Sequence, residues 1–222
     1  MTTISNVSTV SVEIPYEHGG PKAGWGGQSW NKLSILLVKV ETQDGYTGWG
    51  EGFSYNCRPA VKAVVERMIA PVVVGLDAGD IIGISRDMQR KLHLFGRYGI
   101  TIFALSALDI ALWDIAGKRA GFPIHRLLGG AARTHVPGYA SLLKYGDPDL
   151  VGQNVAKARS DGYDAIKIHE TTVAAVAASR EAAGDGTPLM VDTNCPWTPE
   201  QARIMAERLQ VYDLHWLEEP IF

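Results

Sequence analysis

The chain has 222 residues, a formal net charge of −3 at pH 7 and an apolar content of 46%, so it can bury a sizeable core. A charge this small indicates no particular partner, and the lack of a basic tract argues against nucleic-acid binding. No apolar run reaches the roughly 18 residues of a membrane span, and the polar N-terminus lacks the apolar core of a signal peptide. We therefore expect a soluble, cytoplasmic protein without a membrane partner, in which Cys57 and Cys195 are free thiols rather than a disulfide.

The first third of the chain is typical of β-structure. Residues 4–14 alternate weakly between apolar and polar, residues 33–40 are densely apolar, and residues 46–52 follow a turn containing Gly45. The last two segments predict an antiparallel hairpin. Residues 16–31 contain five glycines and two tryptophans. Their composition alone favours an ordinary surface loop, and a loop that closes over a ligand is the alternative.

Two helices are predicted next. Residues 59–69 carry apolar side chains at helical spacing, and the helix should end near Pro71. Residues 102–120 are apolar on nearly all sides, which predicts a buried rather than an amphipathic helix. Gly121 and Pro123 should terminate it.

After Gly130 short apolar segments alternate with helical ones. Asp147 and Thr198 are the predicted N-caps of two of the helices. Such a repeat is typical of parallel βα units, here the first four units of a (β/α)₈ barrel in an α/β protein. An open doubly wound sheet is the alternative, although no Gly-rich phosphate turn follows any of the strands. The predicted strands are 136–142, 165–168, 189–192 and 214–217, and the predicted helices are 148–160, 171–183 and 199–209.

Ionisable side chains stand where three of these strands end. Lys167 and His169 share one face of their strand because side chains repeat every second residue. Asp192 and Glu218 come from adjacent strands, so at the carboxyl edge of a barrel they can point to one place. Two carboxylates suit Mg²⁺, and a lysine and a histidine beside them suit proton transfer. Each feature alone is common in surface loops and structural positions, but three consecutive strand ends with such groups indicate an active site.

The same motifs, in the same order, resemble the mandelate racemase and muconate-lactonizing branch of the enolase superfamily. Residues 48–51, Gly-Trp-Gly-Glu, fit the hairpin of that family, and residues 107–130 resemble its linker into the barrel. The resemblance covers essentially the whole chain. It implies an α+β capping domain, residues 1–130, followed by the first half of a (β/α)₈ barrel, residues 131–222.

The resemblance also implies roles for single residues. Asp192 and Glu218 would bind Mg²⁺, while Lys167 would bind the carboxylate of a small-molecule substrate and His169 would be the base. The family usually has Lys-x-Lys on this strand, so His169 is a departure, although a histidine can also serve as a base. Further expected contributors are Asn194 and Glu219 beside the metal, and Trp25, Trp30 and Ser141 for substrate binding.

Residues 16–31 would then be the family's specificity loop, and the protein is expected to be a homo-oligomer. The third metal ligand and a second acid/base would follow later strands, beyond Phe222, and would come from a longer protein or from another chain. The remaining alternative is that this chain is a truncated product. The reaction implied is proton abstraction α to a carboxylate, most often followed by dehydration of a hydroxylated sugar acid. Racemisation, epimerisation and cycloisomerisation are alternatives on the same scaffold, and a catalytically inactive half-barrel used for assembly is an alternative of another class.

Overall fold

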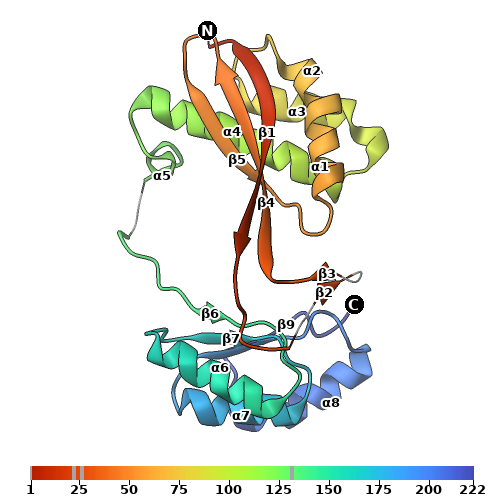
Figure 1. Cartoon of the computed structure of the whole chain (residues 1–222), viewed down its shortest axis with the longest axis vertical. Coiled ribbons are helices and arrows are strands. Elements are labelled where there is room, and N and C mark those ends of the chain that lie inside the picture. Colours follow the sequence, from red (N-terminus) through yellow and green to blue (C-terminus); the bar gives the residue numbers. More distant parts are fainter. Residues whose placement is uncertain (1, 22–23, 26–27, 131–132) are drawn as a thin grey trace. The chain divides into compact units, whose positions relative to one another are not determined.

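A computed structural model of the chain describes residues 2–21, 24–25, 28–130 and 133–222. Its elements form two compact units, whose helices and strands are labelled in Figure 1. Unit 1 comprises Met1–Tyr16 and Lys32–Thr134, and unit 2 comprises Glu17–Asn31 and His135–Phe222. The segment Glu17–Asn31 therefore belongs to unit 2 by its contacts, although in sequence it lies between two strands of unit 1.

Unit 1 contains a three-stranded antiparallel sheet in the order β1-β4-β5. Strand β1 spans Ile4–Pro15, β4 spans Lys32–Thr42 and β5 spans Thr47–Gly52. From Leu36 to Thr42 every second side chain of β4 is buried, as the alternation of a half-buried strand requires. Gly45 adopts φ +87° in the turn between β4 and β5, and the predicted antiparallel hairpin is confirmed.

The helices of unit 1 pack against this sheet around one apolar core. Helix α4 is long and apolar enough, by length and composition, to cross a membrane, but nine of its residues are buried within unit 1 as a core helix. It ends at Gly121, which takes a left-handed conformation with φ +68°. The helical elements of unit 1 are α1 (Arg58–Val64), the π-helical turn η1 (Val65–Ile69), α2 (Ala70–Val73), α3 (Ile81–Lys91), η2 (His93–Phe95), α4 (Ile100–Ala120) and α5 (Ile124–Leu127).

Strand β5 approaches α4 so closely that two of its residues can only be glycine. A Cβ atom on Gly48 would lie 2.1 Å from the carbonyl oxygen of Ala111, and one on Gly50 would lie 2.0 Å from that of Ala107. Both obstacles are backbone atoms of a buried helix, which cannot move aside as a flexible side chain could. Two turns of α4 therefore rest directly on the backbone of β5.

Unit 2 contains a four-stranded parallel sheet in the order β6-β7-β8-β9, with neighbours in sequence also neighbours in the sheet. This unreversed order confirms the predicted βα repeat and differs from a doubly wound sheet, in which the order reverses. Asp147 and Thr198 cap α6 and α8 as predicted. The elements are the short hairpin β2 (Gly24–Trp25) and β3 (Gln28–Ser29), then β6 (Ala140–Ser141), α6 (Pro148–Ser160), β7 (Ile166–Ile168), α7 (Val173–Ala183), β8 (Leu189–Asp192), α8 (Pro199–Leu209), η3 (Gln210–Tyr212) and β9 (Trp216–Glu218).

Several elements differ from the sequence-based predictions. The helix predicted over residues 59–69 does not end near Pro71 but continues through η1 and α2 to Val73. Strand β6 pairs only at Ala140 and Ser141, whereas a strand over residues 136–142 was predicted, because only these two residues meet partners on β7. Helix α3 was not predicted at all. Its buried side chains Ile81, Ile84 and Met88 nonetheless recur at helical spacing after Asp80, a residue type that favours the N-cap, and the side chain of Asp80 caps the helix in the structure. Both cysteines are free thiols, as predicted.

Candidate active site

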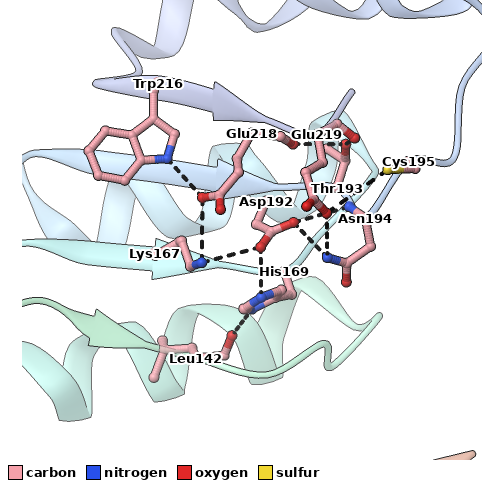
Figure 2. Close-up of polar contacts among 10 residues, drawn as sticks. All are labelled: Leu142, Lys167, His169, Asp192, Thr193, Asn194, Cys195, Trp216, Glu218 and Glu219. Carbon is pink, nitrogen blue, oxygen red and sulfur yellow. Dashed lines mark hydrogen bonds and ion pairs between the residues drawn. The ribbon is translucent and has the colours of Figure 1, made fainter. Parts of the chain in front are cut away.

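The register of the parallel sheet brings the predicted site residues to one edge. Asp192, the last residue of β8, pairs with Glu218, the last residue of β9. Lys167 lies in β7, paired with Met190 two residues before Asp192, and His169 follows directly after β7. Asp192 is only 5% exposed and Lys167 only 9%. The four side chains therefore meet at the carboxyl end of the sheet, where βα folds build their sites (Figure 2).

The ammonium group of Lys167 joins the two carboxylates. Its Nζ lies 3.2 Å from Oδ2 of Asp192 and 3.4 Å from Oε2 of Glu218. It also lies 5.8 Å from the ring centre of Tyr139, close enough for a cation–π contact. Burial by itself would lower the pKa of Lys167, but the hydrogen bond to Asp192 and the charges of Asp192 and Glu218 outweigh it, so the pKa lies above its usual value.

The imidazole of His169 is held on both sides. Its Nδ1 bonds the backbone carbonyl oxygen of Leu142 and its Nε2 lies 3.1 Å from Oδ2 of Asp192 (Figure 2). A carbonyl oxygen can only accept, so the proton of this hydrogen bond is on Nδ1. Nε2 is therefore the ring atom that can gain or lose a proton at the site.

The loops that follow β8 and β9 support the two carboxylates. Asn194 donates to Oδ1 of Asp192 from its side chain at 2.7 Å and from its backbone N–H at 3.1 Å. The Asn194 amide also lies 3.4 Å from Oε2 of Glu219. Asn194 and Glu219 both adopt positive φ, 54° and 49°, which is uncommon for residues other than glycine. The predicted support of Asp192 by Asn194 is thus present as a hydrogen bond, while Glu219 itself contacts Asn194 and not Asp192.

Two aromatic residues at the site were missed by the sequence analysis. The indole Nε1 of Trp216 donates to Oε2 of Glu218 at 3.0 Å (Figure 2), and the ring of Tyr139 packs edge-on against Trp216. Trp216 stands two residues before Glu218, so the period of a strand already placed both on one face. Tyr139 lies outside β6 and carries no comparable signal in the sequence.

The predicted substrate-binding residues are less closely tied to this cluster. Ser141 is exposed and pairs in register with Lys167 across β6 and β7. Trp30 is half-buried in unit 2. Trp25 lies in β2, but its side chain lies outside the part of the chain that the structure describes.

The two carboxylates suit a divalent cation. Asp192 and Glu218 already converge on one positive charge, the ammonium group of Lys167, which stands in for a cation between them. Within the described ranges, no three His, Cys, Asp or Glu side chains gather closely enough to hold a metal ion by themselves. Mg²⁺ binds to proteins through as few as one or two carboxylates and retains several waters, so the pair fits part of its coordination sphere.

Two family models match the chain. Residues 22–129 match the mandelate racemase / muconate lactonizing enzyme N-terminal domain, and residues 151–222 match the enolase C-terminal domain-like family. The chain is 34% identical over 205 residues to arabinonate dehydratase from Saccharolobus solfataricus, covering 88% of this chain and 54% of that protein. It is 38% identical over 197 residues to 3,6-anhydro-alpha-L-galactonate cycloisomerase from Streptomyces coelicolor, covering 85% of this chain and 54% of that protein.

Solved structures share the architecture. L-talarate/galactarate dehydratase from Salmonella typhimurium LT2, liganded with Mg and L-lyxarohydroxamate, superposes with a TM-score of 0.83 at 30% identity, over 100% of this chain and 59% of that one. The chain spans about half the length of the curated relatives it matches. The matched models, the relatives and the parallel βα repeat agree with one another, and the chain belongs to the mandelate racemase/muconate lactonizing enzyme family of the enolase superfamily.

Proposed function

We propose that the protein removes the proton α to the carboxylate of a hydroxylated sugar acid, with His169 as the base and Mg²⁺ as the cofactor, and that the product forms by loss of water. One observation carries the proposal. Nε2 of His169, Nζ of Lys167 and the carboxylates of Asp192 and Glu218 converge at the ends of three neighbouring strands. The names of the relatives, a dehydratase and a cycloisomerase of sugar acids, support the same class of substrate.

His169 and Lys167 have separate tasks in this proposal. Nε2 of His169 accepts the α-proton, while the bond from Nδ1 to Leu142 holds the ring in place and fixes the tautomer. With a metal ion held by Asp192 and Glu218, Lys167 would be released from both carboxylates and would donate to the carboxylate of the substrate. The low exposure of Lys167 and Asp192 keeps water away from these groups, which strengthens their electrostatic effect.

Asp192 and Glu218 are the residues that would hold Mg²⁺, with Asn194 orienting Asp192 through its side-chain amide. When bound there, Mg²⁺ would supply a Lewis acid for the negative charge that develops on the substrate carboxylate.

The atoms of the dehydration balance without a further reagent. The proton leaves the α-carbon for Nε2 of His169, and the resulting enediolate expels hydroxide from the β-carbon, which takes up a proton and leaves as water. The enol that remains tautomerises to a 2-keto-3-deoxy acid. In a cycloisomerisation or an epimerisation no net water is lost, so the products distinguish these reactions.

The test is a screen of sugar acids in D₂O with Mg²⁺, using the protein with all the chain that its gene encodes. We expect NMR to show loss of the α-proton signal with at least one acid and a carbonyl assay to show a 2-keto acid. If a substrate exchanges its α-proton but forms no keto acid, the reaction is an isomerisation and not a dehydration. If Mg²⁺ binds and yet no acid exchanges or reacts, the enzymatic proposal is wrong and an assembly role gains support.

A further inference from the structure

The residue after His169 is a buried carboxylate that the proposed reaction does not use. Glu170 is only 1% exposed. Its Oε1 accepts the backbone N–H of Tyr145 at 2.8 Å and that of Gly146 at 3.0 Å. A carboxylate removed from water is costly unless hydrogen bonds compensate for the lost hydration, and here two backbone donors do so. Glu170 thus fixes the backbone just before α6.

The stretch thus fixed, residues 142–146, also holds the proposed base. The carbonyl oxygen of Leu142 accepts the proton of His169 Nδ1, and the backbone N–H of Leu142 donates to the carbonyl oxygen of Lys167 at 2.8 Å. The connection between β6 and α6 is therefore bonded at Leu142 to Lys167 and His169, and at Tyr145 and Gly146 to Glu170. A shift of this connection would move the partner of His169 Nδ1.

Tyr145, which lies within residues 142–146, also contacts a segment that is distant in the sequence. Its hydroxyl donates to the carbonyl oxygen of His18 at 2.8 Å, and the two rings stack with centres 6.3 Å apart and planes 26° from parallel. A Cβ atom on Gly20 would lie 2.4 Å from Cδ1 of the Tyr145 ring, so the chain passes directly over that ring. Tyr145 is only 7% exposed, which leaves its ring little freedom to move.

A second side chain of unit 2 holds the same segment. The side-chain amide of Asn154, on α6, donates to the carbonyl oxygen of Gly19 at 3.0 Å and to that of Leu150 at 2.9 Å. Gly19 has φ +76°, a conformation that favours glycine. Residues 18–20 are therefore seated on the β6–α6 connection and on α6 by defined bonds, and by their contacts they belong to unit 2.

We propose that Glu170 and Tyr145 are positioning residues of one clamp, built on residues 142–146, that aligns the base His169 and seats residues 18–20 beside the same connection. The catalytic part of this inference rests on the proposed function, because it takes His169 as the base. Glu170 acts on His169 through the position of the Leu142 carbonyl. Tyr145 acts on the start of the segment Glu17–Asn31 and does not touch His169.

Substitutions of Glu170 and of Tyr145 should therefore change kcat and KM differently. Glu170→Ala leaves two buried N–H groups without an acceptor and releases the connection, so kcat should fall by about tenfold or more as His169 loses its alignment, and KM should rise. Tyr145→Phe removes one hydrogen bond to His18 and should raise KM by about fivefold while kcat stays within about twofold. Glu170→Gln retains an acceptor oxygen for both N–H groups and should restore most of kcat.

The experiment measures kcat and KM for α-proton exchange in these variants, together with ¹⁵N NMR of labelled histidine to observe the Nδ1–H of His169. Glu181→Ala on the exposed face of α7 and Tyr163→Phe are matched controls in the same unit and should change nothing. The Nδ1–H resonance should shift or exchange rapidly in Glu170→Ala and stay in place in Tyr145→Phe and Glu170→Gln.

The NMR arm needs no turnover, so it tests the clamp even if no substrate is found and the proposed function fails. An unchanged Nδ1–H resonance in a folded Glu170→Ala variant would overturn the role of Glu170. A fall in kcat equal to the rise in KM for Tyr145→Phe would overturn the division of tasks. If Glu170→Ala does not fold, Glu170→Gln decides by the same resonance, because loss of the signal there would contradict the proposal.

Discussion

Nε2 of His169 lies 3.1 Å from Oδ2 of Asp192, across the boundary between two neighbouring parallel strands. The same oxygen lies 3.2 Å from Nζ of Lys167. One carboxylate oxygen is therefore shared by the proposed base and by the residue proposed to bind the substrate carboxylate. A cation that took this oxygen would release Lys167 from its bond to Asp192 and would place a positive charge beside the unprotonated Nε2 of His169. Under the proposed function, binding of the metal ion would therefore free Lys167 for the substrate carboxylate in the same step.

The first prediction concerns the base. His169→Asn should lower the rate of α-proton exchange with D₂O by about 10²–10⁴-fold, the usual contribution of a general base. Asparagine retains an N–H donor near the position of Nδ1, so the bond to Leu142 can persist while Nε2 is lost. Mg²⁺ affinity, measured by calorimetry, should stay nearly unchanged. His125→Asn, an exposed histidine of unit 1, is the control. Exchange that continues at the original rate would show that another group removes the proton.

The second prediction concerns the charge between the carboxylates. Lys167→Met leaves the buried Asp192 without its lysine and should lower the free energy of unfolding by about 3 kcal/mol, as breaking a buried ion pair does. Because the pKa of Lys167 is raised, the ammonium stabilises the fold throughout neutral pH and loses this effect only as the pH rises through that raised value.

Mg²⁺ should restore more stability to Lys167→Met than to the unaltered protein, because it supplies the missing positive charge. Thermal unfolding with Mg²⁺ and with EDTA measures this difference. Lys157→Met, on the exposed part of α6, is the matched control, since its pair with Asp161 is solvated. If Mg²⁺ raised the melting temperature of all three proteins equally, the metal would not bind at Asp192 and Glu218.

The third prediction is a pH dependence in unit 1. The pKa of Glu66 is lowered chiefly by its hydrogen bond to Lys62 and then by the bond from Thr9, which tie η1 to α1 and β1. A lowered carboxyl pKa adds stability above the unfolded-state value, and that stability is lost as the pH falls through the folded-state value. Glu66→Gln should therefore lower the melting temperature at pH 7 and leave it unchanged near pH 2.

The size of this effect should be about 0.5–1 kcal/mol at pH 7, because the pair is partly solvated. Glu51→Gln, an exposed glutamate on β5, is the control and should show no such dependence. A difference between Glu66→Gln and the original protein that persists at low pH would mean that shape and not charge determines the contribution of this residue.

The fourth prediction concerns the contact of β5 with α4. Gly50→Ala places a methyl group 2.0 Å from a backbone oxygen and should destabilise unit 1 by about 1–3 kcal/mol or more, the cost of overpacking a core. Gly138→Ala is the control, because a Cβ there meets nothing within 4 Å and its φ is not positive. Chemical denaturation of the two variants compares them directly. Equal stabilities would contradict the close approach.

Much of the fold followed from the sequence because its patterns are local. The buried strands β7 and β8 and the caps Asp147 and Thr198 lie where apolar runs and capping residues predicted them. Helix α3 carries a local pattern of the same kind, with Ile81, Ile84 and Met88 at helical spacing after the N-cap Asp80, although it was not among the predicted elements. Pairing, and not composition, limits β6 to two residues.

The part of the candidate site that lies on the strands could be predicted from strand geometry. Period two and parallel order sufficed to bring Lys167, His169, Asp192 and Glu218 together. The bonds from Glu170 to Tyr145 and from Tyr145 to His18 could not be predicted, because they join residues 25 and 127 positions apart through loops. No periodicity relates such positions, so only the folded chain reveals them. The roles of these residues in catalysis stay predictions.

The two glycines of the motif Gly-Trp-Gly-Glu, Gly48 and Gly50, are required by packing. Both positions are closed to every other amino acid by the carbonyl oxygens of α4, whereas the exposed side chains of Trp49 and Glu51 between and after them meet no such limit. The spacing Gly-x-Gly therefore reflects the close approach of strand β5 to helix α4 and no chemistry. A variant that lacked the strand-end carboxylates would still need these two glycines for the packing of unit 1, so the glycines report on the fold and the strand-end residues must be inspected separately for activity.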